Sequence, residues 1–431
     1  MSARDRVLDL LLGSERVAGQ AGITSVCSAH PLVLEAACRE AKRAGTVVLI
    51  EATCNQVNQD GGYTGMTPAD FRAFVLGIAR HVGLAGGRVI LGGDHLGPNP
   101  WKALPADEAM AKAEVMVAAY VAAGFRKIHL DCSMGCKGEP VALADAVVAE
   151  RAARLARVAE AAAHEAGLPA PVYIIGTEVP PPGGATHEIQ TIEVTAASAA
   201  ERTLAVHREA FAAAGVAGAL ERVIGLVVQP GVEFGNANVV VYDPPAARDL
   251  SAALGRLPGL VFEAHSTDYQ PTDALTALVD DGFAILKVGP GLTFALREAL
   301  YGLDAIAREL RLGHGEPLPA VMERLMLDEP GDWRSHYPGT PDEQYLQRHF
   351  SYSDRIRYYW THPEAVASVD RLMAALDAAS IPETLVSQYL GRLYPAVAAG
   401  DLPARPKALC LAAIDLALAP YRTATTRGEV A

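Results

Sequence analysis

Cysteine is scarce in this sequence. The chain has 6 cysteines in 431 residues, and most fall within or beside expected strands or helices, which is not the pattern of a disulfide framework. Cys132 and Cys136 have no second pair of cysteines with which to complete a metal site, so we interpret them as loop thiols. We therefore expect reduced thiols and a cytoplasmic protein.

Positive charge is also scarce. The 37 lysines and arginines are outnumbered by 50 aspartates and glutamates, which leaves a formal net charge of -13. Nucleic acids and anionic membranes are bound by clustered lysine and arginine, so we expect neither as a partner. A phosphorylated small molecule stays compatible with this charge, because a local pocket can be positive on an acidic protein.

Long apolar runs and nucleotide-binding loops are missing as well. No uncharged apolar stretch approaches the length of a membrane span, and the first apolar stretch contains acidic residues, unlike a signal peptide. No Gly-x-Gly-x-x-Gly turn follows the first expected strand, which argues against an open Rossmann-type sheet. No Gly-x-x-x-x-Gly-Lys-Ser/Thr loop occurs, which argues against a kinase.

The sequence does contain a regular alternation of short β-branched runs with alanine-rich stretches, from about residue 22 to residue 312. Such alternation is typical of βα units with a parallel sheet. We expect eight strands, at residues 23–27, 46–52, 88–92, 127–131, 171–177, 223–228, 260–264 and 284–288, and helices at 68–82, 106–122, 141–165, 196–214 and 272–280. Because these strands are apolar on both faces, we predict an α/β fold with a closed (β/α)8 TIM barrel over residues 1–317.

The strand pattern stops after about residue 318. Helices are expected at residues 322–327, 363–376, 382–394 and 406–418, so we predict a C-terminal helical extension, residues 318–431, that packs on the barrel. Residues 345–360 of this region are rich in aromatic and basic side chains. The simpler interpretation is an amphipathic helix packed on the barrel, and the alternative is a lid that offers Arg355 or Arg357 to a phosphate.

Polar residues close the apolar runs, and the active site of a TIM barrel lies at the carboxyl ends of its strands. The strand-end residues are Ser25, Ser28, Glu51, Asn55, Gln56, Asp94, His95, His129, Asp131, Ser133, Glu178, Gln229, His265, Ser266, Asp268, Lys287 and Gly289. From this set we predict as substrate-binding residues Ser25, Glu51, Asn55, Gln56, Asp131, Ser266, Lys287 and Gly289, together with Arg355 of the C-terminal region.

Two histidines at matching strand ends suggest a metal site. His95 and His265 can each offer a neutral nitrogen to a divalent ion, and Glu178 or Gln229 can add oxygen donors while a position stays open. This set suits Zn²⁺, with Mn²⁺ or another first-row metal as alternatives. A buried histidine can also be an ordinary core residue, so the sequence leaves both readings open.

Asp94 lies beside His95, and neighbouring side chains cannot point the same way along a regular strand. If the strand has ended there, its carboxylate can act as a general acid/base, although a helix cap or surface salt bridge is an equal alternative. Residues 288–293, Val-Gly-Pro-Gly-Leu-Thr, open the helix after the eighth strand, where barrel enzymes usually seat phosphate, but they can also form a plain turn. Residues 177–184 are either an active-site loop or an ordinary proline-rich loop.

Several segments together resemble a known family. They are residues 51–59, 62–68, 92–99, 128–134, 176–180, 262–270, 286–291 and 351–360. With them, the chain resembles the tagatose-1,6-bisphosphate aldolase subunits of the GatZ/KbaZ type, which are related to the class II metal-dependent fructose-bisphosphate aldolases.

The resemblance implies roles for individual residues. Asp94 looks like the proton-transferring aspartate of the class II aldolases, His95 and His265 look like two of their metal-binding histidines, and Glu178 falls in the segment of their metal-proximal catalytic glutamate. At the sixth strand those aldolases have another ligand histidine, whereas this chain has Gln229, whose amide is a weaker donor.

Members of this family have been described as ketohexose-phosphate epimerases and as non-catalytic partners of an aldolase subunit. The retained Asp94, His95, Glu178 and His265 favour a metal-dependent 4-epimerase that converts tagatose 6-phosphate to fructose 6-phosphate by retro-aldol chemistry. The alternatives are class II cleavage of tagatose 1,6-bisphosphate and a subunit that stabilises a separate aldolase chain. We also expect a homo-oligomer.

Overall fold

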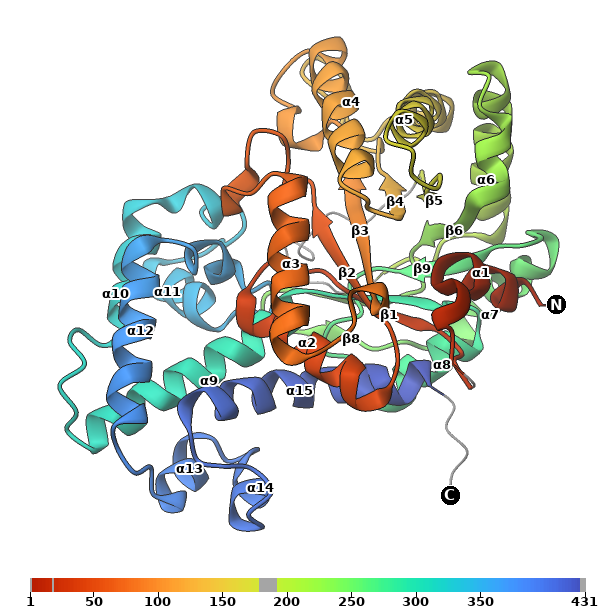
Figure 1. The fold of residues 1–431 in the computed structure, drawn as a ribbon. Helices are drawn as coiled ribbons and strands as arrows, with labels where there is room; N and C mark the ends of the chain where they lie inside the picture. Colours follow the sequence, from red (N-terminus) through yellow and green to blue (C-terminus); the bar gives the residue numbers. More distant parts are fainter. Residues whose placement is uncertain (1, 18, 178–191, 427–431) are drawn as a thin grey trace.

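Eight parallel strands close into a barrel in the computed structural model, which describes residues 2–17, 19–177 and 192–426. The strand order around the barrel is β1-β10-β9-β6-β5-β4-β3-β2 (Figure 1). The strands are β1 Ile23–Val26, β2 Val48–Thr53, β3 Val89–Leu96, β4 Lys127–Leu130, β5 Val172–Ile175, β6 Val223–Val228, β9 Val261–Ala264 and β10 Ile285–Val288, with a small antiparallel hairpin of β7 Glu233–Phe234 and β8 Val239–Val240. The predicted (β/α)8 barrel is therefore confirmed.

A helix follows each barrel strand. These helices are α2 Pro31–Ala44, α3 Pro68–Val82, α4 Ala106–Ala122, α5 Asp145–Glu165, α6 Ala197–Ala213, α7 Pro244–Ala253, α8 Thr272–Asp280 and α9 Pro290–Glu309. Helix α3 shows why they begin and end where they do: Thr67 and Asp70 form a capping box, and Gly83 ends the helix in the left-handed conformation. Several expected bounds shift. For example, α5 begins at Asp145 instead of 141, and β3 runs on to Leu96 instead of ending at 92. The helix expected at residues 382–394 is wrong, because α13 Glu383–Tyr389 ends earlier and α14 Tyr394–Ala398 begins only at Tyr394.

The lower half of the barrel interior is apolar and is closed by a helix that the sequence pattern did not predict. Helix α1, Ala3–Leu12, buries Val7, Leu8, Leu11 and Leu12 against interior side chains of the strands such as Leu49. Each fully buried leucine contributes about 1.5–3 kcal/mol relative to an exposed one. The floor of the barrel is therefore sealed, and the polar interior lies at the opposite end.

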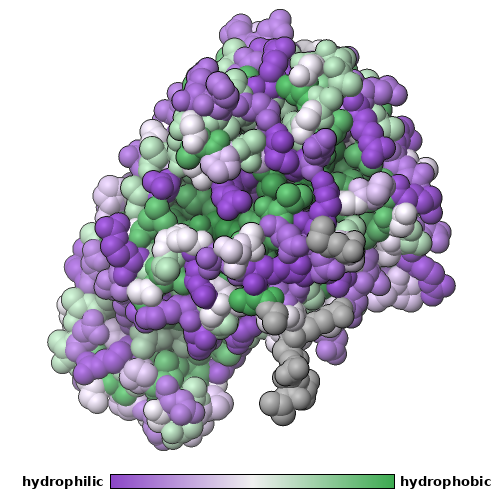
Figure 2. All heavy atoms as spheres, turned by 45° about the vertical axis from the view of Figure 1, so that its right-hand side comes forward, coloured by the Kyte–Doolittle hydropathy of each residue, from purple (hydrophilic) through white to green (hydrophobic). Residues whose placement is uncertain are grey.

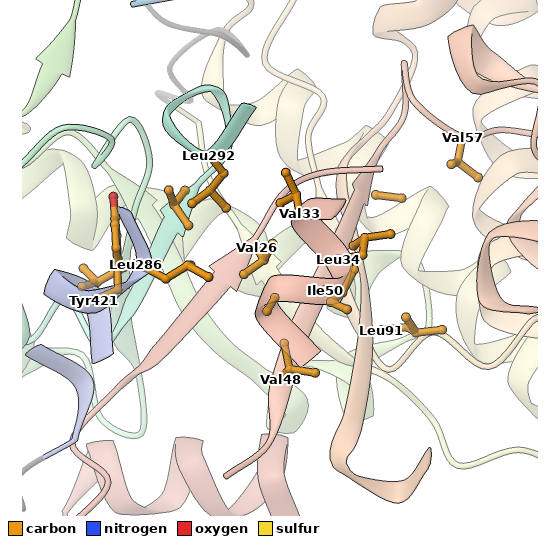
Figure 3. Close-up of a cluster of buried hydrophobic side chains, with 14 of the residues drawn as sticks. Val26, Val33, Leu34, Val48, Ile50, Val57, Leu91, Leu286, Leu292 and Tyr421 are labelled. Atoms are coloured by element: carbon orange, nitrogen blue, oxygen red, sulfur yellow. The ribbon is translucent and has the colours of Figure 1, made fainter. Parts of the chain in front are cut away.

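The main core lies between the strands and the surrounding helices. Figure 3 shows Val26 of β1 and Ile50 of β2 beside Leu34 of α2, and Leu286 of β10 near Leu292 of α9. One glycine is required by close approach: a Cβ at Gly92 of β3 would lie 2.7 Å from Cγ of Glu51. Gly92 thus leaves room for a charged side chain inside the barrel.

The C-terminal region gathers on one side of the barrel before its last helix returns to it (Figure 1). Its helices are α10 Leu318–Asp328, α11 Pro341–Phe350, α12 Pro363–Asp377, α13 Glu383–Tyr389, α14 Tyr394–Ala398 and α15 Pro406–Thr425. Helix α15 packs against α2, α8 and α9 of the barrel. The Thr425 carbonyl accepts hydrogen bonds from the amides of Ala21 (2.9 Å) and Gly22 (3.2 Å), just before β1. The predicted boundary at residue 317 falls just before α10.

The aromatic-basic segment is not one amphipathic helix, so that interpretation was wrong. Helix α11 ends at Phe350, Ser351 is extended, and Asp354 has a φ of 46° before a short 3-10 helix, η8 Arg355–Tyr359. The chain bends here because the Asp354 carboxylate is held by Thr293 Oγ1 (2.6 Å) and Arg297 Nε (3.3 Å) of α9. The bend places η8 over the mouth of the barrel.

Short 3-10 turns complete the fold. They are η1 Gly13–Glu15, η2 Gly62–Thr64, η3 Gly86–Arg88, η4 Asn99–Trp101, η5 Ala217–Arg222, η6 Leu254–Arg256 and η7 Pro330–Asp332. Hydrophilic residues cover most of the face drawn in Figure 2, around a central band of apolar ones. Within the described residues, every helix is too short or too polar to span a lipid bilayer.

Candidate active and metal site

Two connected cavities lie at the carboxyl ends of the barrel strands. The inner cavity, of about 80 Å³, is lined by Cys27, Thr53, Asn55, Gln56, Tyr63, Asp94, His95, Phe234, His265, Ser266, Asp268, Lys287, Val288, Gly289, Pro290, Arg357 and Tyr358. The outer cavity, of about 570 Å³, lies between α2 and the C-terminal region and shares Cys27, Gln56, Tyr63, Gly289 and Arg357 with the inner one. A ligand can therefore reach from the barrel interior to η8.

Three buried histidines meet at the inner cavity. The ring centroids of His95, His129 and His265 lie 4.9–5.2 Å apart. One ligand atom from each, with a carboxylate oxygen of Asp94, all lie within 4.8 Å of one another. Imidazoles and a carboxylate at this spacing form a group that can bind a divalent metal.

Asp131 fixes the orientation of His95. Its Oδ2 lies 2.7 Å from His95 Nδ1, and its Oδ1 accepts hydrogen bonds from the amide (3.1 Å) and hydroxyl (2.6 Å) of Ser133. Burial alone would raise the pKa of Asp131, but the hydrogen bond and charge of His95 lower it far below its usual range. An ionised carboxylate behind one imidazole nitrogen leaves the other, Nε2, to face the cluster, which is how metal-binding histidines are commonly supported.

His265 is kept neutral. Burial and the nearby charge of Lys287 lower its pKa to about 3, and Glu263 Oε1 lies 2.9 Å from its Nε2. Only a neutral imidazole can donate a lone pair to a metal, so this shift favours binding.

His129 is the third histidine of the group, and its hydrogen bonds test whether these residues fit a metal ion. Its Nδ1 lies 3.0 Å from Asp94 Oδ1, while its Nε2 is buried with no hydrogen-bond partner among the described residues. A buried imidazole nitrogen without a partner is unusual unless a ligand satisfies it. The residues present therefore fit a metal ion. Sequence reasoning placed His129 at the end of the fourth strand but did not name it a ligand.

One predicted ligand, Gln229, does not join this group in the part of the chain that the structure describes. Gln229 Oε1 accepts hydrogen bonds from the amides of Gly231 (2.8 Å) and Val232 (2.9 Å), so both of its lone pairs are used in its own loop. The metal role expected of Gln229 is therefore not supported, and His129 provides the third imidazole instead. Glu178 lies outside the described residues.

An irregularity in β3 brings Asp94 and His95 into the same site. The pairing of β3 with β4 shifts register between Gly93 and Leu96, and His95 has a φ of 50°, which is strained for a residue with a side chain. The strand thus does not end before Asp94. Burial would raise the pKa of Asp94, but His95, Lys287 and His129 lower it well below its usual value, so the carboxylate is ionised.

Beneath the cavity lies a buried network of charges that sequence reasoning largely missed. Lys127 Nζ pairs with Glu51 Oε1 (2.6 Å) and Glu263 Oε2 (2.7 Å), and Lys287 Nζ pairs with Asp94 and Glu51 Oε2 (3.2 Å). The available signal was a lysine and a glutamate inside the apolar runs of the fourth and seventh expected strands. A charge inside such a run requires a partner of opposite sign.

The predicted substrate-binding residues divide into two groups. Asn55, Gln56, Ser266, Lys287 and Gly289 line the inner cavity. Ser25 and Glu51 are fully buried outside its lining, and Asp131 lies behind His95, so they support the site without lining it.

Arg355 also points away from the cavities. Its Nε donates to the Asp332 carbonyl, and it lines neither cavity. The neighbouring Arg357 lines both cavities, so the cation expected of this segment is Arg357.

The glycine-rich turn before α9 is occupied by a carboxylate. Asp268 Oδ1 accepts hydrogen bonds from the amides of Gly289 (2.9 Å) and Gly291 (2.7 Å). Burial raises the pKa of Asp268 to about 6, against the effect of these two bonds, so it is ionised above that pH. The phosphate seat expected at residues 288–293 therefore already holds an anion from the protein itself.

Comparison with known proteins assigns the family. The model of the family described as "D-tagatose-1,6-bisphosphate aldolase subunit GatZ/KbaZ-like" matches residues 8–426. The chain belongs to this family. The resemblance expected from the sequence is therefore confirmed.

Two relatives in the family are similar to this chain over most of its length. One, from Agrobacterium fabrum strain C58, is named D-tagatose 6-phosphate 4-epimerase and is 60% identical over 424 residues, covering 98% of this chain and 99% of its own. The other is a crystal structure described as a probable tagatose 6 phosphate kinase from Sinorhizobium meliloti 1021. It is 61% identical, covers 94% of this chain and 100% of its own, and has a TM-score of 0.87.

Proposed function

We propose that this protein is a metal-dependent 4-epimerase that interconverts tagatose 6-phosphate and fructose 6-phosphate. The observation that carries the proposal is the buried group of three imidazoles around an ionised Asp94, at the mouth of the barrel of a chain 60% identical to a named epimerase. The related crystal structure is described as a probable kinase, but this sequence lacks the Gly-x-x-x-x-Gly-Lys-Ser/Thr loop by which P-loop kinases bind phosphate.

The position of C4 favours bond cleavage over direct deprotonation. In a 2-ketose the carbon C4 is not adjacent to the carbonyl, so removal of its hydrogen would leave an unstabilised carbanion. Breaking the C3–C4 bond instead places the bonding electrons on the C1–C3 fragment as an enediolate, while C4 becomes an aldehyde carbon. The aldehyde then turns, C3 adds to its other face, and C4 is inverted.

Asp94 is placed to move the proton in both directions. Its ionised carboxylate accepts the proton of the C4 hydroxyl as the C3–C4 bond breaks, and returns it when the bond forms again. Lys287, ion-paired with Asp94, keeps that carboxylate anionic and holds a positive charge beside the developing enediolate. Both residues line the inner cavity.

His95, His129 and His265 would hold the metal, and three imidazole nitrogens with an open position are a donor set that suits Zn²⁺. A divalent ion bound there would supply Lewis-acid polarisation of the sugar's carbonyl oxygen. The surrounding chain supplies the orientation, since Asp131 and Glu263 hold two of the rings from behind.

The proposed function is tested by incubating the purified chain alone with fructose 6-phosphate in D₂O and following the sugars by NMR. We expect tagatose 6-phosphate to appear without free triose and without deuterium at C4, because the C4 hydrogen never leaves its carbon. Deuterium at C4 would contradict the retro-aldol route. Failure to form tagatose 6-phosphate with added Zn²⁺ or Mn²⁺ would contradict the epimerase.

His129→Ala is expected to lose bound metal. The wild-type chain, purified without chelator, should carry about one divalent ion, and the variant, which lacks one of three imidazole ligands, should bind it at least 10-fold more weakly. Elemental analysis after dialysis measures this, and it also identifies the metal. His164→Ala, at an exposed position near the end of α5, is the control and should keep the ion. Equal metal content in the two variants would remove His129 from the site.

Arg357→Met is expected to raise the KM for the sugar phosphate about 10- to 100-fold, because a charge-assisted hydrogen bond contributes about 1.5–3 kcal/mol. Arg357 lines both cavities. Arg355→Met is the matched control and should change the KM little, since Arg355 lines neither cavity. Initial rates measure both KM values. A larger rise in KM for Arg355→Met than for Arg357→Met would indicate that Arg355 binds the phosphate.

A further inference from the structure

Asp268 occupies the position at which this barrel would bind an anion. Helix α9 has 20 residues, and the amides of its N-cap Gly289 and of Gly291 in its first turn donate to Asp268 Oδ1. The fit is close, because a Cβ at Gly291 would lie 3.0 Å from that oxygen. Asp268 is 3% exposed and lines the inner cavity together with His265 and Ser266. The favourable field of the helix N-terminus is thus neutralised by a side chain of the protein.

Of the lysine and arginine side chains that line the two cavities in the described residues, Arg357 is the one left to bind a phosphate. Lys287 is committed to Asp94 and Glu51, and Lys407 of the outer cavity has Glu35 Oε2 at 2.8 Å from its Nζ. Arg357 is different. Within the described residues its Nη1 donates to the carbonyls of Ser353 and Asp354, and its Nη2 donates to the Tyr358 hydroxyl at 2.9 Å.

Arg357 has N–H donors left for a phosphate. A guanidinium has five N–H donors, and three are used in these bonds. The Nε–H and one Nη2–H have no hydrogen-bond partner among the described residues, and Arg groups bind phosphate well through two such donors. The inner cavity therefore offers donors to a phosphate at Arg357 and presents a carboxylate at Asp268.

We propose that Asp268 is a specificity-determining residue that restricts the site to ketohexoses with a single phosphate. The inference rests on the proposed epimerase function, and it names the phosphorylation state of the substrate. A second phosphate at the α9 end would meet a buried carboxylate in place of free amides, and two anions repel strongly where little water screens them. An unphosphorylated end instead presents a hydroxyl, which can donate a hydrogen bond to Asp268.

The same argument orients the sugar. With the phosphate of C6 at Arg357, the C1 hydroxyl lies toward Asp268 and the carbons C2 to C4 lie between them, near the histidines and Asp94. The bisphosphate required by an aldolase of this family does not fit this arrangement. Asp268 thus separates the epimerase from the aldolase by its negative charge and by occupying the two amides.

The test is a comparison of two ligands by isothermal titration calorimetry on the full-length, metal-loaded protein. Fructose 6-phosphate and fructose 1,6-bisphosphate are titrated into wild type, Asp268→Ser and Asp268→Asn. We expect wild type to prefer the monophosphate by at least 100-fold. Asp268→Ser removes the charge and frees the amides, so it should narrow this ratio at least 10-fold, mainly through tighter bisphosphate binding. Asp268→Asn removes the charge but keeps an oxygen for the amides, so it should give an intermediate ratio.

Asp273→Ser is the matched control. Asp273 is also an aspartate at the start of a helix, in the first turn of α8, but it is exposed and lines neither cavity. The ratio of the two ligand affinities in Asp273→Ser should equal that of wild type. Thermal melting and metal content establish that each variant is folded, and Asp268→Asn carries the test if the serine variant does not fold.

Two results would overturn the inference: equal wild-type affinity for the two ligands, or an unchanged ratio in a folded Asp268 variant. The proposed function fails separately. A wild-type chain that prefers the monophosphate through Asp268 but forms no tagatose 6-phosphate supports the selectivity and rejects the epimerase. If the chain is an active epimerase but the ratio of its two ligand affinities is unchanged in the Asp268 variants, the inference is rejected and the proposed function stands.

Discussion

Asp94→Asn is expected to lower kcat for the conversion of fructose 6-phosphate about 1,000-fold. A positioned acid/base group contributes roughly 10²- to 10⁴-fold, and an amide cannot accept the C4 hydroxyl proton. The substitution keeps the size and shape of the side chain, so the inner cavity should still bind the sugar. The KM is therefore expected to change much less than kcat, which is the pattern for loss of an interaction made in the transition state.

The measurement is an initial-rate assay on metal-loaded enzyme, with metal content and melting temperature recorded for each variant. Asp60→Asn provides the matched control, because Asp60 is an exposed aspartate that pairs with Lys112 (3.0 Å) and lines neither cavity. It should retain full activity. If Asp94→Asn keeps its metal and turns over within a few-fold of wild type, Asp94 is not the proton-transferring group.

Lys127→Met is expected to lower the free energy of unfolding by about 3–5 kcal/mol, the usual cost of leaving a buried charge without its partner. Lys127 is 0% exposed, and its ammonium lies between Glu51 and Glu263. Those two carboxylates hold its pKa above the usual value, although burial acts in the opposite direction. Methionine fills a similar volume, so the loss measures charge compensation more than packing.

Urea denaturation followed by circular dichroism measures this difference. Lys112→Met is the matched control, because Lys112 is half-exposed in its pair with Asp60 and such pairs contribute about 0–1 kcal/mol. Adding Glu263→Gln to Lys127→Met should restore part of the loss, since it removes one of the stranded carboxylates. Equal unfolding free energies for Lys127→Met and Lys112→Met would show that the buried network adds nothing to stability.

The barrel was predictable because its strands carry their own signature. Residues 223–228, Val-Ile-Gly-Leu-Val-Val, are apolar on both faces, and the strand β6 begins and ends at those residues. Residues His129 and Asp131 stand two apart, so they face the same side of an extended segment. That spacing was the available signal that both side chains belong to the site. In the structure His129 joins the other histidines, and Asp131 supports His95 on the neighbouring strand.

Other features depend on contacts between distant segments and leave no local pattern. The shift of register after Gly93 lets Asp94 and His95 share a site, although strand alternation forbids it. Arg355 and Arg357 are alike in sequence, and the bend at Asp354, imposed by α9, decides which of them reaches the cavity. Asp268, in the loop after β9, binds the amides of Gly289 and Gly291 at the start of α9, and the sequence of residues 288–293 gives no sign of this contact.

The bonds between Thr425 and the residues just before β1 also determine when this chain can finish folding. A chain emerging from the ribosome presents β1 and all seven other barrel strands before α15 exists. The groove between α2, α8 and α9 stays open until residues 406–425 are synthesised and α15 packs into it. The last turn of α15 thus fixes the segment just before β1, and a ribosome that stalls before residue 406 leaves a nascent barrel with an exposed apolar groove.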